Sequence, residues 1–182
     1  MAVSFLDEIR EPELKEVFLY WLGKRSGRAV PLRGDIGPVG IDPRHLPHLF
    51  MYRKEANGRF RCILVGTEIV NVYHRDETGR YLDEIVPSHS RNSRLKLFAR
   101  CIDEARPVYY RGPALIHTRE RRRLGRLLLP LSSSGETADY IFGMALFGPV
   151  LDNLPPGLPL PESEEPTAIA VASDEDMRIG PD

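Results

Sequence analysis

The densest group of chemically competent side chains in the sequence is a run of arginines. Five of them, followed by a serine-rich turn, lie between residues 119 and 135: Arg119, Arg121, Arg122, Arg123, Arg126, Ser132, Ser133, Ser134 and Gly135. Guanidinium groups hold phosphate oxygens through paired hydrogen bonds, so the 119–126 cluster is a candidate phosphate-binding site. The alternative is a solvated strand face with Leu127 and Leu129 on the opposite face, which is the commoner origin of charged runs.

Two histidines three positions apart, His45 and His48, have the residue type that binds metal ions. A zinc site needs three or four protein ligands, and no third ligand stands near these histidines in the sequence. We therefore predict no metal site.

No combination of residues in the sequence matches a catalytic centre. No serine stands in a G-x-S-x-G turn, and neither a phosphate-binding loop nor a dinucleotide fingerprint occurs. The acidic pairs 83–84 and 103–104 are sequence neighbours, whose side chains diverge on a strand or a helix. We expect no catalytic residues and no enzymatic activity, with a small enzyme of unknown reaction as an alternative.

The stretch 60–85 supplies candidates for ligand binding. An apolar strand over 60–65 ends at Gly66, a short amphipathic helix over 67–73 follows, and a polar turn occupies 74–80. Tyr73, His74 and Arg75 lie where this helix ends and the polar turn begins, so a small ligand could contact them. The alternative is a simple helix end, at which the helix dipole favours a histidine.

An amphipathic helix is predicted over 12–24, where apolar side chains recur at helical spacing and Pro12 suits the first turn. It carries Val17, Phe18 and the only tryptophan, Trp21. These side chains either close the core or contact a partner, because amphipathic helices cover cores and aromatic residues are enriched at interfaces. We take Val17, Phe18 and Trp21 as candidate interface residues.

The remaining pattern predicts a sheet and one longer helix. A hairpin joins strands over 49–54 and 59–65 through Asn57-Gly58, a helix covers 92–105, and strands follow over 108–116, 120–130 and 139–146. This order predicts an α+β fold with about five antiparallel strands. From residue 151 the chain is rich in proline and acidic residues, which predicts a disordered tail.

Composition limits the classes of partner. A length of 182 residues predicts one compact domain, and a formal net charge of -1 provides no long-range attraction for nucleic acid. Cys62 and Cys101 lack the spacing of a disulfide or zinc framework and are expected to be buried apolar residues. The sequence has no signal peptide and no apolar run of about 20 residues, so we expect a cytoplasmic protein without membrane contact.

Four strings, in this order, carry a family resemblance: YWLGKRSGRAVPLRGDIGPVGI, LPHLF, FRCILVGTEIVNVYHRDETGRYLDEI and LLLPLSSSG. Together they resemble the PAS-like single-domain family of alphaproteobacteria, over about residues 10–150. The resemblance implies a PAS-like five-stranded antiparallel sheet with helices packed on one face. The expected divisions are an N-terminal flanking helix in 1–27, the PAS-like domain in 28–150 and the tail in 151–182.

For function, the resemblance implies a non-enzymatic bacterial sensory or regulatory module that acts in signal transduction by protein–protein interaction. A small-molecule ligand between the sheet and the longer helix is a further expectation. The expected pocket residues are Ile69, Tyr73, His74, Phe98, Cys101 and Tyr140. No kinase, cyclase or helix-turn-helix output domain occurs in the sequence, so we expect a signalling protein as partner, and a homodimer through the N-terminal helix.

No cofactor is expected from the resemblance. Flavin-binding PAS relatives carry a reactive cysteine in the short-helix segment, which here reads EIVNVYHRDETG without cysteine. Haem-binding relatives use a histidine on the longer helix, and the predicted helix over 92–105 contains none.

The arginine cluster and its serine-rich turn are also similar to the cyclic-dinucleotide motif of PilZ domains. The Asp or Asn that usually opens the second part of that motif is absent, and the two parts lie closer together than usual. A cyclic-dinucleotide receptor acting through Arg121, Arg122, Arg126 and Ser133 is therefore the alternative binding function.

Overall fold

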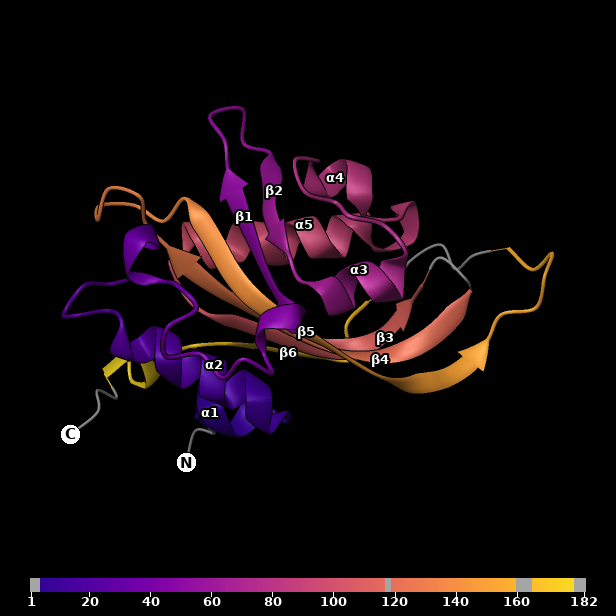
Figure 1. Ribbon diagram of the computed structural model, residues 1–182, viewed down its shortest axis with the longest axis horizontal. Helices are drawn as coiled ribbons and strands as arrows, with labels where there is room; N and C mark the ends of the chain where they lie inside the picture. Colours follow the sequence, from indigo (N-terminus) through magenta and orange to yellow (C-terminus); the bar gives the residue numbers. More distant parts are fainter. Residues whose placement is uncertain (1–3, 117–118, 160–164, 179–182) are drawn as a thin grey trace.

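The structure is a computed structural model that describes residues 4–116, 119–159 and 165–178. Its centre is a six-stranded antiparallel sheet with the strand order β2-β1-β5-β4-β3-β6 (Figure 1). The strands are β1 (Leu49–Lys54), β2 (Phe60–Val65), β3 (Val108–Leu115), β4 (Glu120–Leu131), β5 (Tyr140–Asn153) and β6 (Ala168–Val171). The α+β fold with an antiparallel sheet is thereby confirmed.

The helices lie mainly in the first 103 residues of the chain. They are α1 (Phe5–Glu8), α2 (Pro12–Gly23), α3 (Thr67–Tyr73), α4 (Leu82–Ile85) and α5 (Ser88–Asp103), with short 3₁₀ turns η1 (Arg33–Asp35), η2 (Leu46–His48) and η3 (Asp176–Arg178). The predicted N-terminal helix and the short helix after Gly66 are both present. The longer helix begins at Ser88, four positions before its expected start, and therefore includes His89.

Helices pack on one face of the sheet, as expected, and the N-terminal helices cover the other face. α3, α4 and α5 lie over one face, whereas α1 and α2 pack against the other (Figure 1). Neighbouring residues of β4 consequently enter different cores, with Leu127 and Leu129 packed on the α2 side and Leu128 on the α5 side. Two-sided burial explains why this strand reads as a nearly continuous apolar run.

The N-terminal helix α2 is part of the core. Val17, Phe18 and Trp21 are at most 2% exposed, and the indole Nε1 of Trp21 donates a 2.9 Å hydrogen bond to the carbonyl oxygen of Pro130 in β4. This burial corrects the interface hypothesis for the three residues, because they close the apolar face of the sheet within one chain. It also corrects the division at residue 27, since α2 and the sheet share one core.

The expected disordered tail contains ordered structure. β5 continues to Asn153, and β6 pairs with β3, with Ile169 opposite Tyr110. Asp176, buried beyond β6, accepts a 2.8 Å hydrogen bond from the backbone N–H of Phe5 in α1. The described part of 151–182 therefore adds a sixth strand and connects the last segment to the first helix. Residues 160–164 and 179–182 lie outside the described residues.

Gly66 produces the sharp turn from β2 into α3. Its backbone N–H donates a 2.7 Å hydrogen bond to the carbonyl oxygen of Leu49, which brings the turn against η2. A Cβ atom at this position would lie 2.1 Å from the carbonyl oxygen of Pro47. Only glycine fits here without displacing the backbone, and α3 is thereby held over the sheet.

No helix in the described part of the chain has both the length and the apolar character required to cross a membrane.

Candidate functional site

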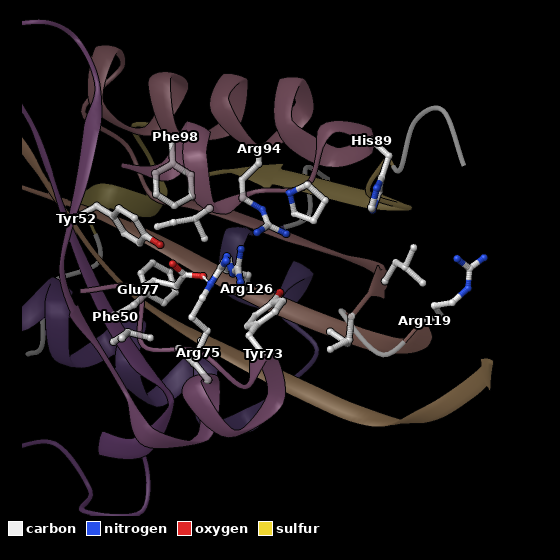
Figure 2. Close-up of a pocket in the computed structure, with 16 residues that line it drawn as sticks. Phe50, Tyr52, Tyr73, Arg75, Glu77, His89, Arg94, Phe98, Arg119 and Arg126 are labelled. Carbon is white, nitrogen blue, oxygen red and sulfur yellow. Dashed lines mark hydrogen bonds and ion pairs between the residues drawn. The ribbon is translucent and has the colours of Figure 1, made fainter. Parts of the chain in front are cut away.

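A cavity of about 360 Å³ lies between the sheet and the three helices α3, α4 and α5 (Figure 2). For comparison, an engineered apolar cavity of about 150 Å³ is large enough to bind benzene. The pocket therefore has room for a ligand larger than one aromatic ring. Its walls come from α3, α4, α5 and the strands β1, β2, β3 and β4, with the 74–77 turn beside them.

Aromatic side chains form one wall of the pocket. Phe98 of α5 lies 6.5 Å from Phe50 in a stacked arrangement and 5.2 Å from Tyr52 in an edge-to-face arrangement, measured between ring centroids. Phe60 packs against the edge of the same ring at 5.5 Å. Because these rings support one another, the wall is a preformed apolar surface.

Arg126 of β4 is the buried charged group of this site. Its side chain is directed into the cavity (Figure 2), and the residue is only 6% exposed. Nη1 donates a 3.1 Å hydrogen bond to the hydroxyl oxygen of Tyr110, and the guanidinium carbon lies 5.5 Å from the centroid of the Phe50 ring. The buried Nε–H has no hydrogen-bond partner among the described residues, nor does any of their carboxylates form an ion pair with Arg126.

The one described carboxylate in the pocket is already neutralised. Glu77, 6% exposed, forms an ion pair with Arg75 and accepts a 3.1 Å hydrogen bond from Nη1 of Arg80. Glu77 is therefore occupied by its two arginine neighbours and does not compensate Arg126.

Arg119, at the far end of the pocket, donates from Nε to the carbonyl oxygen of Leu154 at 3.4 Å.

Burial also shifts the pKa of Tyr52, whose phenol belongs to the aromatic wall. It raises the pKa of Tyr52 well above the ordinary value of a tyrosine, although the positive charges of Arg126 and Arg94 act in the opposite direction. The phenol is therefore neutral at physiological pH. The shift reflects the low polarity of the surroundings, where a charge on a ligand would interact strongly with a guanidinium group.

The loop that carries Arg75 and Glu77 is held against the β1–β2 hairpin. Backbone hydrogen bonds join the N–H of Gly79 to the carbonyl of Cys62 and the N–H of Cys62 to the carbonyl of Arg80, each at 2.8 Å. His74 closes α3 in the left-handed backbone region, with φ of 55°, and directs the chain into this loop. The pocket edge at residues 75–77 is thus tied to β2.

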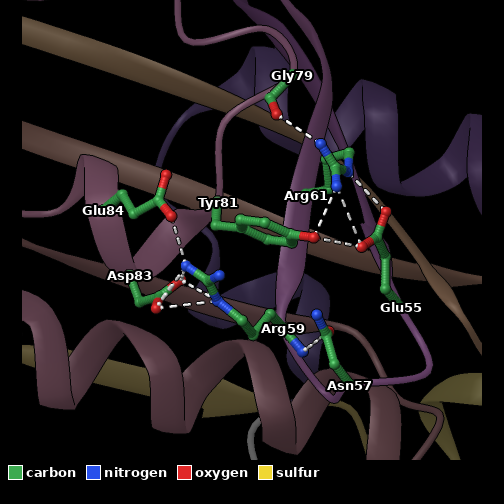
Figure 3. A network of polar contacts seen from close by, with 8 residues as sticks. All are labelled: Glu55, Asn57, Arg59, Arg61, Gly79, Tyr81, Asp83 and Glu84. Carbon is green, nitrogen blue, oxygen red and sulfur yellow. Dashed lines mark hydrogen bonds and ion pairs between the residues drawn. The ribbon is translucent and has the colours of Figure 1, made fainter.

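A polar network fixes the next segment to the same hairpin (Figure 3). Arg61 donates from Nη2 to the hydroxyl oxygen of Tyr81, and that hydroxyl donates to Glu55, each at 2.6 Å. The guanidinium carbon of Arg59 lies 3.7 Å from the centre of the Tyr81 ring. The same guanidinium donates to the carboxylates of Asp83 and Glu84. The network holds α4 against the turn end of the hairpin, beside the pocket.

The pocket residues expected from sequence separate into two groups. Ile69, Tyr73 and Phe98 line the cavity. His74 is exposed at the end of α3, and Cys101 is fully buried in the core away from the cavity lining.

Tyr140 is likewise placed away from the pocket. It packs with the core on the α2 side and lies 5.7 Å from the guanidinium carbon of Arg53. The reason is the alternation of side chains along β5, where a one-residue error moves a side chain to the opposite face of the sheet. The assignment of His74, Cys101 and Tyr140 to the lining is therefore corrected.

Several lining residues were not anticipated from the sequence. They are Phe50, Tyr52, Val65, Glu77, Ile85, Pro87, His89, Arg94, Leu115, Ile116, Arg119 and Arg126. The sequence could have indicated Arg126, because it is the only charged residue within the apolar segment 124–131. It did not indicate His89, because the longer helix was expected to begin after this residue. The prediction that the longer helix contains no histidine is wrong, since α5 begins at Ser88 and includes His89.

The arginine cluster does not form a single phosphate-binding surface. Arg121 is paired with Asp152, Arg122 with Glu120, and Arg126 is buried in the pocket. Ser133 belongs to a separate turn, where its backbone N–H donates to Asp139 at 2.7 Å. The tertiary structure therefore separates the residues that the cyclic-dinucleotide interpretation requires to act together.

His45, one of the two histidines considered for metal binding, has acidic neighbours. Nε2 of His45 lies 2.7 Å from a carboxylate oxygen of Glu16, and Asp42 completes a group whose potential ligand atoms lie within 4.8 Å of one another. Helix α2 supplies Glu16, which sequence proximity did not indicate. The hydrogen bonds from Arg44 hold the pKa of Asp42 down at about 2, so a guanidinium already neutralises this carboxylate. His48 is not part of the group.

Both cysteines are free and buried. Burial raises the pKa of Cys62 to about 11 and that of Cys101 well above its ordinary value. Their thiols are therefore protonated at physiological pH and behave as apolar core groups.

A family model described as a PAS domain matches residues 9–146 of the chain. The match includes the described residues of the pocket lining and ends before β6. No curated protein matches the chain in sequence.

Proposed function

The chain belongs to the PAS domain family, whose members are in general sensory or regulatory modules, and we propose that it senses a small molecule held in the pocket between the sheet and α5. The observation that carries the proposal is the cavity of about 360 Å³ with its preformed aromatic wall. Ligand sites in proteins are typically concave, largely apolar and supplied with a few polar groups that orient the ligand.

The short helices around the cavity could shift position when a ligand binds. α3 and α4 are short, and the segment that connects them carries Arg75 and Glu77. A ligand that touches Ile69 and Tyr73 on one side and Phe98 on the other would bias the position of α3 relative to α5. We propose that a partner protein binds the two arrangements with different affinity, so that the module acts by protein–protein interaction.

The proposed activity is binding without catalysis. The described residues of the pocket lining include no serine, threonine, cysteine or lysine that could act as a nucleophile. Glu77 forms ion pairs with both Arg75 and Arg80, so this carboxylate is already engaged by the protein.

Native mass spectrometry of the purified full chain tests the proposal. We expect a fraction of the protein to carry a co-purifying small molecule, or to acquire one from a metabolite extract. The variant Ile69→Trp, which fills the cavity, should lose this bound mass. The exposed α2 residue provides a matched control, Leu19→Trp, which should keep it. Equal bound mass in both variants, or an empty protein under all conditions, would contradict a sensory pocket.

A further inference from the structure

We propose that the ligand of this pocket is a small amphipathic organic anion, with its carboxylate or phosphate head group paired to Arg126 and its apolar body against the aromatic wall. The inference rests on the proposed function, because it names the chemical class of ligand for the same pocket. Four observations support it: the net charge of the lining, the state of Arg126, the position of Arg94 and the apolar part of the lining.

The described lining carries an excess of positive charge. It contains four arginines and one glutamate, namely Arg75, Arg94, Arg119, Arg126 and Glu77, which leaves three positive charges uncompensated within the lining. A cleft with charges of one sign and apolar walls focuses the electrostatic potential and concentrates the opposite ion. An anionic ligand is therefore favoured over a neutral or cationic one.

Arg126 specifies where the negative charge belongs. A guanidinium group does not lose its proton in proteins, so this side chain stays charged although it is 6% exposed. Burial of a charge without a countercharge is unfavourable. The hydroxyl of Tyr110 accepts one hydrogen bond, but it brings no negative charge, and the buried Nε–H is left without a partner in the described structure. An anionic head group against the guanidinium group would supply the countercharge.

Arg94 provides a second positive group from the opposite side of the pocket. It projects from α5 toward the cavity, whereas Arg126 rises from the sheet (Figure 2). No ion pair of Arg94 with a described carboxylate occurs. A carboxylate or phosphate offers at least two oxygens, so one head group can accept hydrogen bonds from both arginines.

The apolar part of the lining requires a ligand with an apolar body. This part comprises Phe50, Ile69, Phe98, Leu115 and Ile116. An inorganic ion would leave these side chains uncovered and the cavity unfilled. Since apolar burial contributes roughly 25 cal/mol per Å², a hydrocarbon tail adds affinity that the head group alone does not provide.

Isothermal titration calorimetry of the full chain with four probes of equal chain length tests the inference. The probes are octanoate, octyl phosphate, 1-octanol and octylamine. We expect at least one of the two anions to bind about 10- to 100-fold more tightly than 1-octanol, which corresponds to one or two charge-assisted hydrogen bonds, and octylamine to bind most weakly. Comparison of octanoate with octyl phosphate distinguishes a carboxylate ligand from a phosphate ligand.

Two variants assign the effect to Arg126. Arg126→Met should reduce the preference for the anions about 10-fold, because Arg94 remains, while leaving the affinity for 1-octanol within about threefold of the wild type. Arg123→Met is the matched control, because Arg123 is an exposed arginine on the same strand outside this pocket, and its anion affinity should not change. The ligand-free Arg126→Met protein should melt at the same temperature as wild type or higher, since it loses an unpaired buried charge. A purely structural arginine would give a lower melting temperature and an unchanged anion preference.

The four probes titrated into the wild-type protein test whether the ligand is an anion, even if Arg126→Met does not fold. Equal affinities for 1-octanol and both anions would overturn the anion class and leave the sensory pocket standing. Absence of binding by all four probes would also overturn the anion class. The native mass spectrum then decides the proposed function separately, because it detects ligands of any charge.

Discussion

Arg126 and Tyr110 are register partners on β4 and β3, and Nη1 of Arg126 donates a 3.1 Å hydrogen bond to the hydroxyl oxygen of Tyr110. The tyrosine hydroxyl thus orients a buried guanidinium group at the base of the pocket without neutralising it. The arrangement keeps a positive charge in place while one of its N–H groups has no described acceptor. This pair is the structural basis for a pocket that is apolar on its walls and positive at its base.

Replacement of Tyr110 by phenylalanine should destabilise the ligand-free protein. The change removes the described acceptor of Arg126 and leaves a further buried donor without a partner, at a cost of about 1–3 kcal/mol in the free energy of unfolding. Urea denaturation followed by circular dichroism measures this cost. Tyr140→Phe is the control, since the described structure gives the Tyr140 hydroxyl no hydrogen bond, and it should change stability by less than about 0.5 kcal/mol. Equal effects of the two substitutions would contradict the assigned role of Tyr110.

Trp21→Phe should show that α2 belongs to the core. The substitution leaves a cavity and removes the hydrogen bond to the carbonyl of Pro130, so we expect a loss of about 2–4 kcal/mol in the free energy of unfolding. Circular dichroism is the appropriate probe, because the variant lacks the only tryptophan. Leu19→Ala, on the exposed side of the same helix, should stay within about 0.5 kcal/mol of wild type. A mild effect of Trp21→Phe would instead support a helix that is not integrated into the core.

Gly66→Ala should destabilise the protein through steric overlap alone. The backbone at Gly66 has φ of -70°, which any residue adopts, but the new Cβ would lie 2.1 Å from the carbonyl oxygen of Pro47. We expect a loss of about 1–3 kcal/mol in thermal or urea unfolding, and a weaker response to pocket ligands because α3 is displaced. Gly34→Ala is the control, since its Cβ would have no neighbour within 4 Å. If both alanine variants are equally stable, the close approach of the turn to η2 is not a constraint.

Asp176 should contribute a pH-dependent part of the stability. Burial disfavours its charged form, but hydrogen bonds from Ser173 and from the backbone N–H of Phe5 outweigh burial and hold the pKa of Asp176 below its ordinary value. A carboxyl group whose pKa is lower in the folded state than in the unfolded state stabilises the fold above the unfolded pKa, about 3.9. That contribution is lost as the pH falls through the lower, folded-state pKa.

The variant Asp176→Asn isolates this contribution. Its free energy of unfolding should be lower than that of wild type near neutral pH, and the difference should shrink as the pH falls below about 4. Measurement of urea denaturation from pH 7 to pH 3 gives both curves. Asp174→Asn is a suitable control, because Asp174 is exposed and forms its ion pair with Arg106 at the surface. Parallel curves for wild type and Asp176→Asn would contradict a stabilising role for the charged carboxylate that joins η3 to α1.

The sequence by itself determined the local elements and much of the fold class. The strands 49–54 and 60–65, the helix after Gly66 and the amphipathic helix from Pro12 all depend on periodicity and turn residues within a few positions. Three pocket residues, Ile69, Tyr73 and Phe98, were found because their helices present one apolar face to the sheet. For these features the neighbours in sequence are sufficient.

The tertiary structure alone decided which polar and apolar groups meet. Trp21 is buried because its partner is Pro130, and Phe5 is bound to Asp176, over separations of 109 and 171 positions that no local pattern encodes. The arginines of β4 look alike in sequence, yet Arg121 faces Asp152 at the surface while Arg126 enters the pocket. Burial and charge compensation depend on the surrounding elements, so only the assembled sheet and helices turn one arginine of that run into a candidate anion-binding group.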